Sequence, residues 1–335
     1  IIAFSTMLVG TGISMKLAFD GMTVRQVSDV YKYDVRVDLG KDIEEEDRGA
    51  VEKVLNGAGT DYTTASYTTH VFRLGDRLDA VNVLAGEPDD LGKYFSVRDA
   101  ASGRDLELPE DGVLAQKKMK ESYDMGEGST LSIFSEELDE CSTEVKGVFQ
   151  NYVGRLVITS PAGYKHIFGA DAPANCYLVK LNGADLAGLE NDLLAVNDDI
   201  SFEVAEEFAK KFETASLLYN LIVMITTGIA ILMSFMILSN LANIFLNRKK
   251  TELTVMRING FSIKQTKGYL TRETVVTTAA GVVLGVIAGA IGTPFIIRTM
   301  EQPDLQFVRT FHLLAWVAAI AIEGLFSLVI YSIVF

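Results

Sequence analysis

The sequence predicts a membrane protein with four transmembrane helices and a large extracytoplasmic mixed α+β domain inserted between the first and second helices. Its 335 residues have a formal net charge of −14, yet 49% of them are apolar. One soluble domain seldom combines these properties, because an acidic surface and a long apolar segment need different surroundings. The acidic residues and the apolar runs also occupy separate parts of the chain. We therefore expect an acidic soluble domain joined to membrane spans.

Four apolar runs are the candidate spans, at about 1–19, 217–246, 275–297 and 312–335. A transmembrane helix needs roughly 20 apolar residues to cross about 30 Å of hydrocarbon. The last three runs meet this length, and the first is short because the chain begins inside it. The chain starts at Ile1, without a Met or the basic region of a signal peptide, and it ends in another apolar run. We therefore expect a fragment of a longer membrane protein.

The distribution of charge predicts the orientation of the spans. Residues 20–215 hold 39 acidic and 20 basic residues, a net charge of −19, whereas residues 216–335 hold five acidic and nine basic residues. Seven of those nine basic residues lie between the second and third spans. Short loops rich in Lys and Arg stay in the cytoplasm. The segment 247–273 is therefore predicted to be cytoplasmic, and the acidic domain and the loop at 300–311 to be external.

The chain is expected to divide at the ends of these segments. The helical pattern from about Ser201 has no Gly or Pro before the second span, which predicts one continuous helix, a stalk. The predicted parts are a truncated first transmembrane helix (1–19), the extracytoplasmic domain (20–204), the stalk and second transmembrane helix (205–246), a cytoplasmic elbow (247–273), the third transmembrane helix (274–299), an external loop (300–311) and a truncated fourth transmembrane helix (312–335).

Local patterns predict both strands and helices in the external domain. Runs rich in β-branched residues or with alternating polarity predict strands at 33–39, 64–74, 78–84, 142–149, 155–160 and 175–181. Residues 125–134 are expected to form a glycine-rich turn that leads into a strand. Runs with helical periodicity and glycine or proline at their ends predict helices at 43–56, 112–123, 161–169 and 185–194.

The sequence contains no catalytic or metal-binding signature. Its three His residues are scattered, and it has no H-E-x-x-H, G-x-S-x-G or Walker A motif. The acidic run at 44–47 lacks the ligand spacing of a Ca²⁺ loop and is expected to be the solvated start of a helix. Cys141 and Cys176 both fall in the external domain, where a disulfide between them would need an oxidising compartment. The acidic net charge argues against nucleic acid as a partner. We therefore expect neither an enzyme nor a protein with its own metal or cofactor.

The cytoplasmic elbow is the most informative segment. Its first part predicts a short helix that ends at Gly260, because glycine readily adopts the left-handed conformation found at helix ends. Ser262 and Gln265 then form a capping-box pattern that begins a second helix, which continues into the third span. Two interpretations fit this basic elbow: it binds anionic lipid at the membrane surface, or it docks a cytoplasmic partner.

The elbow resembles that of a known family. The residues that carry the resemblance are Glu252, Leu253, Met256, Arg257, Gly260, Ser262 and Gln265, after a long span and before a glycine-rich one. Over about 217–335 the chain resembles the FtsX/MacB-like permease family of ABC transporters, although Asn259 stands where that family more often has a small or apolar residue. The external segments LPEDGVLAQKKM, MGEGSTLSI and EVKGVF resemble the family more loosely.

The resemblance implies a function and partners. It implies that a separate cytoplasmic ATPase, which holds ATP and Mg²⁺, contacts the elbow through Glu252 and Arg257, with Met256 and Phe261 as apolar anchors. The chain would then be a permease subunit in the bacterial plasma membrane that converts ATP hydrolysis into a shape change of the external domain, and so exports or extracts a peptide, lipoprotein or antimicrobial compound. The resemblance also permits a sensor or scaffold that regulates an external partner, such as a cell-wall enzyme, without transport. Further expected partners are membrane lipid and a second permease half or a second copy of the chain.

Two features lie inside the predicted spans. Gly281, Gly285 and Gly289 form two overlapping G-x-x-x-G patterns, which let helices pack closely in lipid. Glycine is also common in such helices without a packing role. Glu323 lies mid-span, where a carboxylate is costly and marks a candidate functional residue. We expect it to stay protonated, to pair inside the bundle, or to lie nearer the interface than its position suggests.

Overall fold

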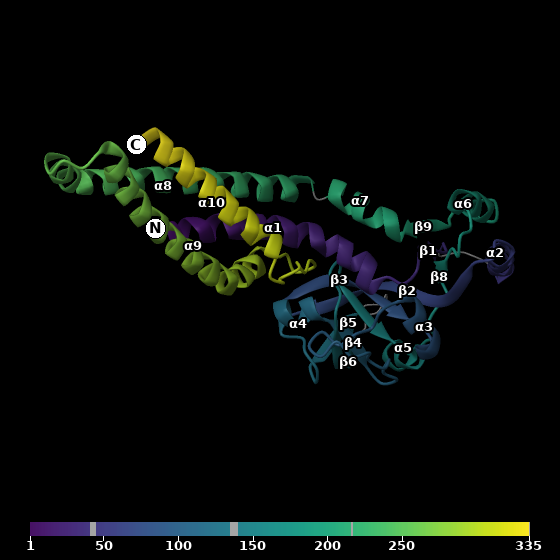
Figure 1. Cartoon of the computed structure of the whole chain (residues 1–335). Helices are drawn as coiled ribbons and strands as arrows, with labels where there is room; N and C mark the ends of the chain where they lie inside the picture. The colour runs from purple at the N-terminus through teal and green to yellow at the C-terminus, as the bar shows by residue number, and fades with distance from the viewer. Residues whose placement is uncertain (41–44, 135–139, 216, 335) are drawn as a thin grey trace. The chain divides into compact units, whose positions relative to one another are not determined.

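The computed structural model describes residues 1–40, 45–134, 140–215 and 217–334 (Figure 1). It divides into two compact units. The helical unit consists of Ile1–Gly21, Ser216–Glu301 and Phe307–Phe335, and the αβ unit consists of Met22–Ala215 and Gln302–Gln306. The division assigns 205–215 and 302–306 to the αβ unit, where the sequence predicted part of a stalk and part of an external loop.

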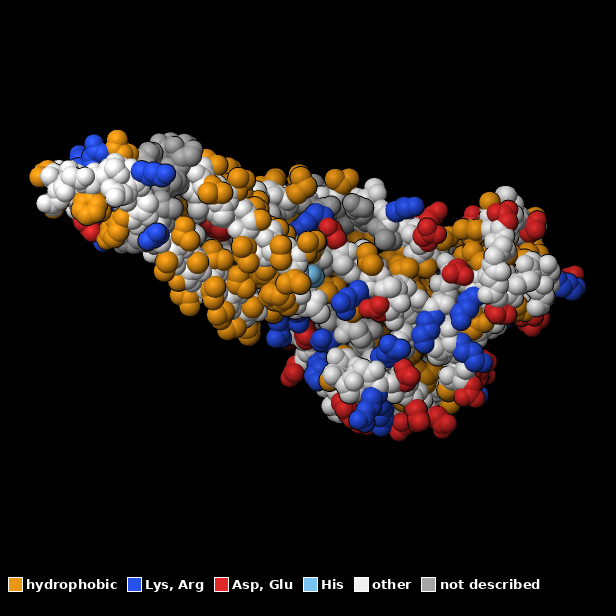
Figure 2. Space-filling view, viewed as in Figure 1, with side chains coloured by type: hydrophobic (Ala, Val, Ile, Leu, Met, Phe, Trp, Pro, Cys, Tyr) orange, Lys and Arg blue, Asp and Glu red, His pale blue; other side chains and the backbone are white. Residues whose placement is uncertain are grey.

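The helical unit contains the predicted membrane spans. Its long helices are α1 (Ile2–Arg25), α8 (Leu217–Ile258), α9 (Ile263–Met300) and α10 (Leu313–Val334). Each contains a segment long and apolar enough to cross a membrane, beginning at Ile2, Leu221, Val275 and Leu313. Figure 2 shows apolar side chains over these helices, whereas charged side chains gather on the αβ unit and around the α8–α9 turn. The four predicted spans are therefore confirmed as helices.

The C-terminal part of α8 differs from the prediction. The sequence predicted a separate short helix before Gly260, but α8 runs for 42 residues without a break from Leu217 to Ile258. Residues 247–258 contain no Gly or Pro and are rich in Lys, Arg, Glu, Leu and Met. Because these residues favour helix, nothing interrupts the hydrogen-bond ladder of the span before the elbow.

Among the described residues, nine strands form the sheet of the αβ unit, in the order β3-β7-β4-β6-β5-β2-β8-β1-β9. They are β1 (Val35–Asp38), β2 (Asp61–Leu74), β3 (Arg77–Ala85), β4 (Val113–Gln116), β5 (Thr130–Phe134), β6 (Glu140–Phe149), β7 (Leu156–Thr159), β8 (Cys176–Lys180) and β9 (Ser201–Val204). Because β3 also pairs with β2, six strands from β3 to β2 close into a ring. The long strand β2 belongs to both parts of the sheet: residues 61–65 pair with β8, and residues 66–74 pair with β3.

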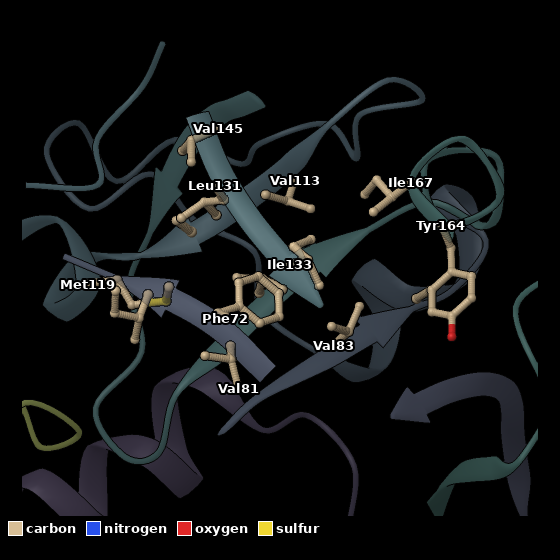
Figure 3. Close-up of a cluster of buried hydrophobic side chains, with 14 residues drawn as sticks. Phe72, Val81, Val83, Val113, Met119, Leu131, Ile133, Val145, Tyr164 and Ile167 are labelled. Carbon is tan, nitrogen blue, oxygen red and sulfur yellow. The ribbon is translucent and has the colours of Figure 1, made fainter. Parts of the chain in front are cut away.

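An apolar cluster fills the six-stranded ring (Figure 3). Phe72 of β2, Ile133 of β5 and Val157 of β7 expose none of their surface. The short helices α4 (Lys117–Tyr123) and α5 (Pro161–Phe168) add Met119, Tyr164 and Ile167 to this cluster. Alternation along the strands turns one face of each strand inward, so the apolar positions meet in one core.

A second core lies on the sheet formed by β2, β8, β1 and β9. The helices α2 (Glu45–Gly57) and α6 (Leu186–Leu194) supply Val51, Leu55, Leu189 and Leu193 to it. Asp185 caps α6 by accepting a hydrogen bond from the Gly188 N–H group at 3.0 Å, as is typical of a helix N-terminus. The mixed α+β character that the sequence predicted for this domain is confirmed.

Three local predictions are wrong or incomplete. Residues 112–123 were predicted as one helix, but β4 takes Val113–Gln116, and only Lys117–Tyr123 form α4. The strand β4 pairs with β6 on one side and β7 on the other, and all four of its side chains are buried, so tertiary structure overrides the local helical pattern. Residues 201–204 pair with β1 as β9, so the helix α7 (Ala205–Ala215) begins later than predicted. The helix α3 (Pro88–Tyr94) was not predicted. The junction at residue 216, which decides whether the stalk is continuous, lies outside the described residues.

Residues 302–306, between α9 and α10, form part of the αβ unit. Leu305 makes an antiparallel bridge with Val153. The Gly154 N–H group donates to the Asp304 carbonyl at 2.9 Å, and the Gln306 N–H group donates to the Tyr152 carbonyl at 2.8 Å. Asp304 and Gln306, predicted only as part of a loop, are therefore hydrogen-bonded through their backbone groups to residues 152–154.

Candidate coupling elbow and buried polar sites

Two backbone hydrogen bonds end α8 at the elbow. Gly260 has φ = +88°, a left-handed conformation that is strained for residues with a Cβ atom. The Gly260 N–H group donates to the Arg257 carbonyl at 3.1 Å, and the Phe261 N–H group donates to the Met256 carbonyl at 3.2 Å. These two bonds form a Schellman motif, which ends the helix at a defined residue.

A capping box begins α9 directly after this motif. The Ser262 hydroxyl accepts a hydrogen bond from the Gln265 N–H group at 3.3 Å, and the Gln265 side chain accepts one from the Ser262 N–H group at 2.9 Å. Both motifs satisfy backbone groups that helix ends otherwise leave to water. The turn between α8 and α9 is therefore short and has a defined geometry.

Glu252 joins the two helices of the elbow. Its carboxylate lies 2.9 Å from the Lys249 ammonium of α8 and accepts a hydrogen bond from the Tyr269 hydroxyl of α9 at 2.9 Å. These bonds, the Lys249 bond first, hold the pKa of Glu252 below its usual value. Glu252, which is expected to contact an ATPase, also links α8 to α9 in the structure and so helps to position the elbow.

The elbow presents an exposed surface that is both apolar and basic. Ile258 exposes 79% of its surface, and Val255, Phe261 and Ile263 are also exposed. Arg257 is exposed among them, whereas Leu253 and Met256 are half-buried. Exposed apolar side chains around a cation are a common composition of docking surfaces.

The glycine face of α9 packs against two other helices of the helical unit. A Cβ atom on Gly281 would lie 2.7 Å from the Ile2 side chain of α1, and one on Gly285 would lie 2.6 Å from the Ala3 carbonyl oxygen. At Gly289 a Cβ atom would come within 1.9 Å of the Trp316 ring of α10. The structure thus brings all three predicted glycines into close helix contacts, where a methyl group does not fit.

Glu323 lies in a buried cluster that joins three helices. It exposes 0% of its surface. The Ser5 hydroxyl of α1 lies 2.7 Å from Glu323 Oε1, the Ser234 hydroxyl of α8 lies 2.8 Å from the same oxygen, and the two serine oxygens lie 2.6 Å apart. Glu323 Oε2 is buried and has no hydrogen-bond partner in the described part of the chain. These contacts fit the expectation that Glu323 pairs inside the bundle.

A buried cluster of amide side chains lies in the αβ unit. Gln26, in the π-helical turn η1 (Gln26–Val30) that follows α1, donates to Asn151 Oδ1 at 2.8 Å and accepts from the N–H groups of Tyr152 and Val153. Asn151 donates to Gln116 Oε1 at 2.9 Å. Gln26, Asn151 and Gln116 are each 1% exposed. The cluster therefore fixes the loop at 151–154 to the end of α1 and to β4.

Arg36 forms a second polar centre in the αβ unit. Its guanidinium bonds both carboxylate oxygens of Asp38, at 2.8 and 3.0 Å, and lies 3.0 Å from Glu203 of β9. It also lies 3.9 Å from the centre of the Tyr67 ring, a cation–π distance. Burial, as the main cause, raises the pKa of Tyr67 to about 12.

A cavity of about 180 Å³ opens beside Arg36. Aromatic side chains line much of it, among them Tyr31, Tyr67, Phe95 and Phe208. Arg155 also reaches this cavity, and its Nε atom has no hydrogen-bond acceptor among the described residues. The cavity has room for one ring-sized apolar group beside a donor.

The described residues do not form a metal site or a disulfide from the acidic and cysteine residues considered in the sequence. Within the described ranges, no group of three or more His, Cys, Asp and Glu side chains could hold a metal ion. Glu45, Glu46 and Asp47 lie in the first turn of α2, as predicted, whereas Glu44 lies outside the described residues. Cys141 and Cys176 are both free thiols, so the disulfide left open by the sequence is not formed.

Four members of these polar sites were not predicted from the sequence: Ser5, Ser234, Gln26 and Asn151. The only signal for the serines was their position in apolar spans, where a hydroxyl needs a partner. The amides carried no signal, because their cluster joins residues more than one hundred positions apart.

The part of the chain that contains the elbow matches a known family. Residues 224–335 match the family model of the FtsX-like permease C-terminal domain. The match covers the second span, the elbow, the third span and the fourth span, in the predicted order. It supports an ABC-type permease, a class that in general works with a cytoplasmic ATPase. A search of curated proteins found no match.

Two solved structures are similar to the αβ part of the chain. The periplasmic region of MacB from Actinobacillus actinomycetemcomitans is 10% identical, with a TM-score of 0.33, over 54% of this chain and 94% of that chain. The extracellular domain of the noncanonic ABC-type transporter YknZ from Gram-positive bacteria is 14% identical, with a TM-score of 0.32, over 51% of this chain and 98% of that chain. Because both TM-scores are low, the description of the αβ fold above depends only on the strand order of this chain. The permease match and the four apolar helices fit a plasma-membrane protein whose soluble domain lies outside.

Proposed function

We propose that this chain is the permease subunit of an ABC transporter and that a separate ATPase docks on the α8–α9 elbow. The observation that carries the proposal is the capped elbow, with Arg257 exposed among Val255, Ile258 and Phe261, within the FtsX-like match. ATP and Mg²⁺ are held by that partner, and this chain supplies the surface. A rigid turn suits such a role because docking then costs little conformational entropy.

Chain continuity supports a mechanical role for the αβ unit. The helix α1 leads directly into η1, where Gln26 bonds the loop at 151–153. The segment joining α9 to α10 bonds the same loop through Asp304 and Gln306. We propose that ATP-driven movement of the helices reaches the αβ unit through these two connections, and that this movement exports or extracts an external substrate such as a peptide, lipoprotein or antimicrobial compound.

The docking proposal is tested by copurification of the full chain with an ABC ATPase expressed in the same cells. The variant carries Arg257→Glu and Phe261→Asp, and a matched control carries Arg104→Glu and Leu78→Asp, two exposed positions of the αβ unit. Loss of an apolar anchor and a cation from an interface typically costs 2 kcal/mol or more, so we expect a roughly 30-fold or greater loss of affinity for the elbow variant alone. Unchanged association of the elbow variant would exclude this docking surface.

A sensor or scaffold remains the second candidate function because of the aromatic cavity in the αβ unit. In that case a ligand in the cavity would alter a response of the cell without export. Measuring both export and the response in cells that express Phe208→Ala separates the two functions. Loss of export supports the transporter, and loss of the response with no detectable export in wild-type cells supports the sensor.

A further inference from the structure

The cluster of Glu323, Ser5 and Ser234 has three close oxygen–oxygen contacts, at 2.6, 2.7 and 2.8 Å. Each contact at such a distance is a hydrogen bond and needs one proton between its two oxygens. An ionised Glu323 would leave only the two serine hydroxyl protons for the three contacts. A protonated Glu323 supplies the third proton, and each of the three oxygens can then donate one hydrogen bond and accept one.

The second carboxyl oxygen leads to the same conclusion. Oε2 is buried without a hydrogen-bond partner in the described ranges. An unpaired carbonyl oxygen is tolerated far better than an unpaired carboxylate oxygen, whose charge the membrane interior does not stabilise.

No cation in the described part of the chain pairs with Glu323 to offset a charge. The spanning parts of α8, α9 and α10 at 221–245, 275–297 and 313–334 contain no other Asp, Glu, Lys or Arg. On α1 the charged residue nearest to Ser5 in the sequence is Lys16, which forms an ion pair with Asp20.

We propose that Glu323 is a proton-binding site inside the membrane bundle, and that its bound proton completes the hydrogen-bonded ring that holds α1, α8 and α10 together. Release of this proton leaves one of the three contacts without a hydrogen and puts a charge in an apolar environment. The contact between these helices is therefore linked to proton binding. This inference does not depend on the ATPase or on any substrate.

Infrared difference spectroscopy of the full chain in lipid nanodiscs at neutral pH tests the proposal. Subtracting the spectrum of Glu323→Gln from that of the wild type is expected to show the C=O stretching band of a protonated carboxylic acid, with a downward shift in D₂O. The matched control is Glu252→Gln, because hydrogen bonds to Lys249 and Tyr269 hold Glu252 in its ionised form. That control subtraction is expected to show carboxylate bands only. Carboxylate bands in the Glu323 subtraction would overturn the proposal.

A second variant keeps the test independent of the folding of Glu323→Gln. Ser234→Ala removes one hydrogen bond to the carboxyl group and is expected to move its C=O band to higher frequency. The absence of that band from both the wild type and Ser234→Ala would overturn the proposal. The glutamine variant should also keep the thermal midpoint of the wild type, since its amide supplies donors without charge, whereas Glu323→Asp should lower it. An equal decrease in both variants would contradict the role of the proton.

Discussion

The amide cluster of the αβ unit and the carboxyl cluster of the helical unit are both buried, but only the first brings enough protons for its contacts. Gln26, Asn151 and Gln116 are neutral and carry their own donors and acceptors, which pair with one another and with the loop at 151–154. Ser5, Ser234 and Glu323 make three contacts and need a proton from outside the chain to complete them. A neutral amide cluster is therefore fixed once the chain folds, whereas a carboxyl cluster has two states. The hydrogen bonds of Gln26, just after α1, therefore do not depend on pH. Under the proposal above, the hydrogen bonds of Ser5 in the membrane part of α1 depend on whether Glu323 carries a proton.

The largest expected loss of stability comes from breaking the amide cluster of the αβ unit. Gln26→Leu leaves the N–H groups of Tyr152 and Val153 and the Asn151 Oδ1 atom buried without partners. Each unsatisfied group costs about 1–3 kcal/mol, so we expect the αβ unit to lose roughly 3 kcal/mol or more of unfolding free energy. Denaturant unfolding followed by tyrosine near-ultraviolet circular dichroism measures this loss. The control Gln302→Leu makes the same change at an exposed position and should have little effect; equal losses in both would show that the cluster is not special.

The next effect tests whether close packing holds the helical unit together. Trp316 contacts both Gly10 of α1 and Gly289 of α9, and a Cβ atom at Gly289 would come within 1.9 Å of its ring. Gly289→Ala therefore overpacks this contact and should cost about 1–3 kcal/mol. Thermal unfolding followed by the fluorescence of Trp316, the single Trp in the sequence, reports on it directly. Gly324→Ala on α10 meets no atom within 4 Å and should be neutral or slightly stabilising, so a destabilised control would contradict the packing argument.

A smaller effect is expected at the charged centre of the αβ unit. Arg36→Met leaves Asp38 and Glu203 without their cation and removes the contact with the Tyr67 ring. Since both carboxylates are about a third exposed, water offsets part of the loss, and we expect roughly 1–2 kcal/mol. The matched change Arg98→Met breaks an exposed ion pair with Asp105 and should cost less than 1 kcal/mol. Chemical denaturation compares the two variants, and a larger loss at Arg98 would refute this ranking.

The smallest effect at neutral pH concerns Tyr67. Burial raises its pKa from 10.0 to about 12, so the folded αβ unit keeps this proton more tightly than the unfolded chain does. Its contribution to stability is fully present below pH 10 and is lost as the pH rises towards 12. We expect Tyr67→Phe to lessen the alkaline decline in stability and to change stability little at pH 7. Unfolding midpoints of both proteins across this range test it; parallel declines would rule out the assignment.

Much of the helical unit could be predicted from the sequence, because its causes are local. The absence of charge over about 20 residues predicts a span, and Gly260, Ser262 and Gln265 predict the elbow from their own conformational preferences. The glycines of α9 could be predicted to lie on one face of the helix, but their partners Ile2, Ala3 and Trp316 could not. The helix containing 247–258 was divided wrongly, since a charge boundary is not a helix boundary.

The arrangement of the αβ unit and the state of Glu323 depend on tertiary structure. Residues 113–116 have a helical local pattern but become β4, because pairing with β6 and β7 and burial of all four side chains outweigh local propensity. The segment 302–306 has no strand pattern, yet its backbone bonds residues 152–154. The sequence by itself determined the spans, the charge asymmetry and the elbow, which arise from neighbouring residues. Only tertiary structure brought Ser5 and Ser234 to Glu323 and Gln26 to Asn151, because hydrogen bonding between distant residues depends on how the helices and strands pack.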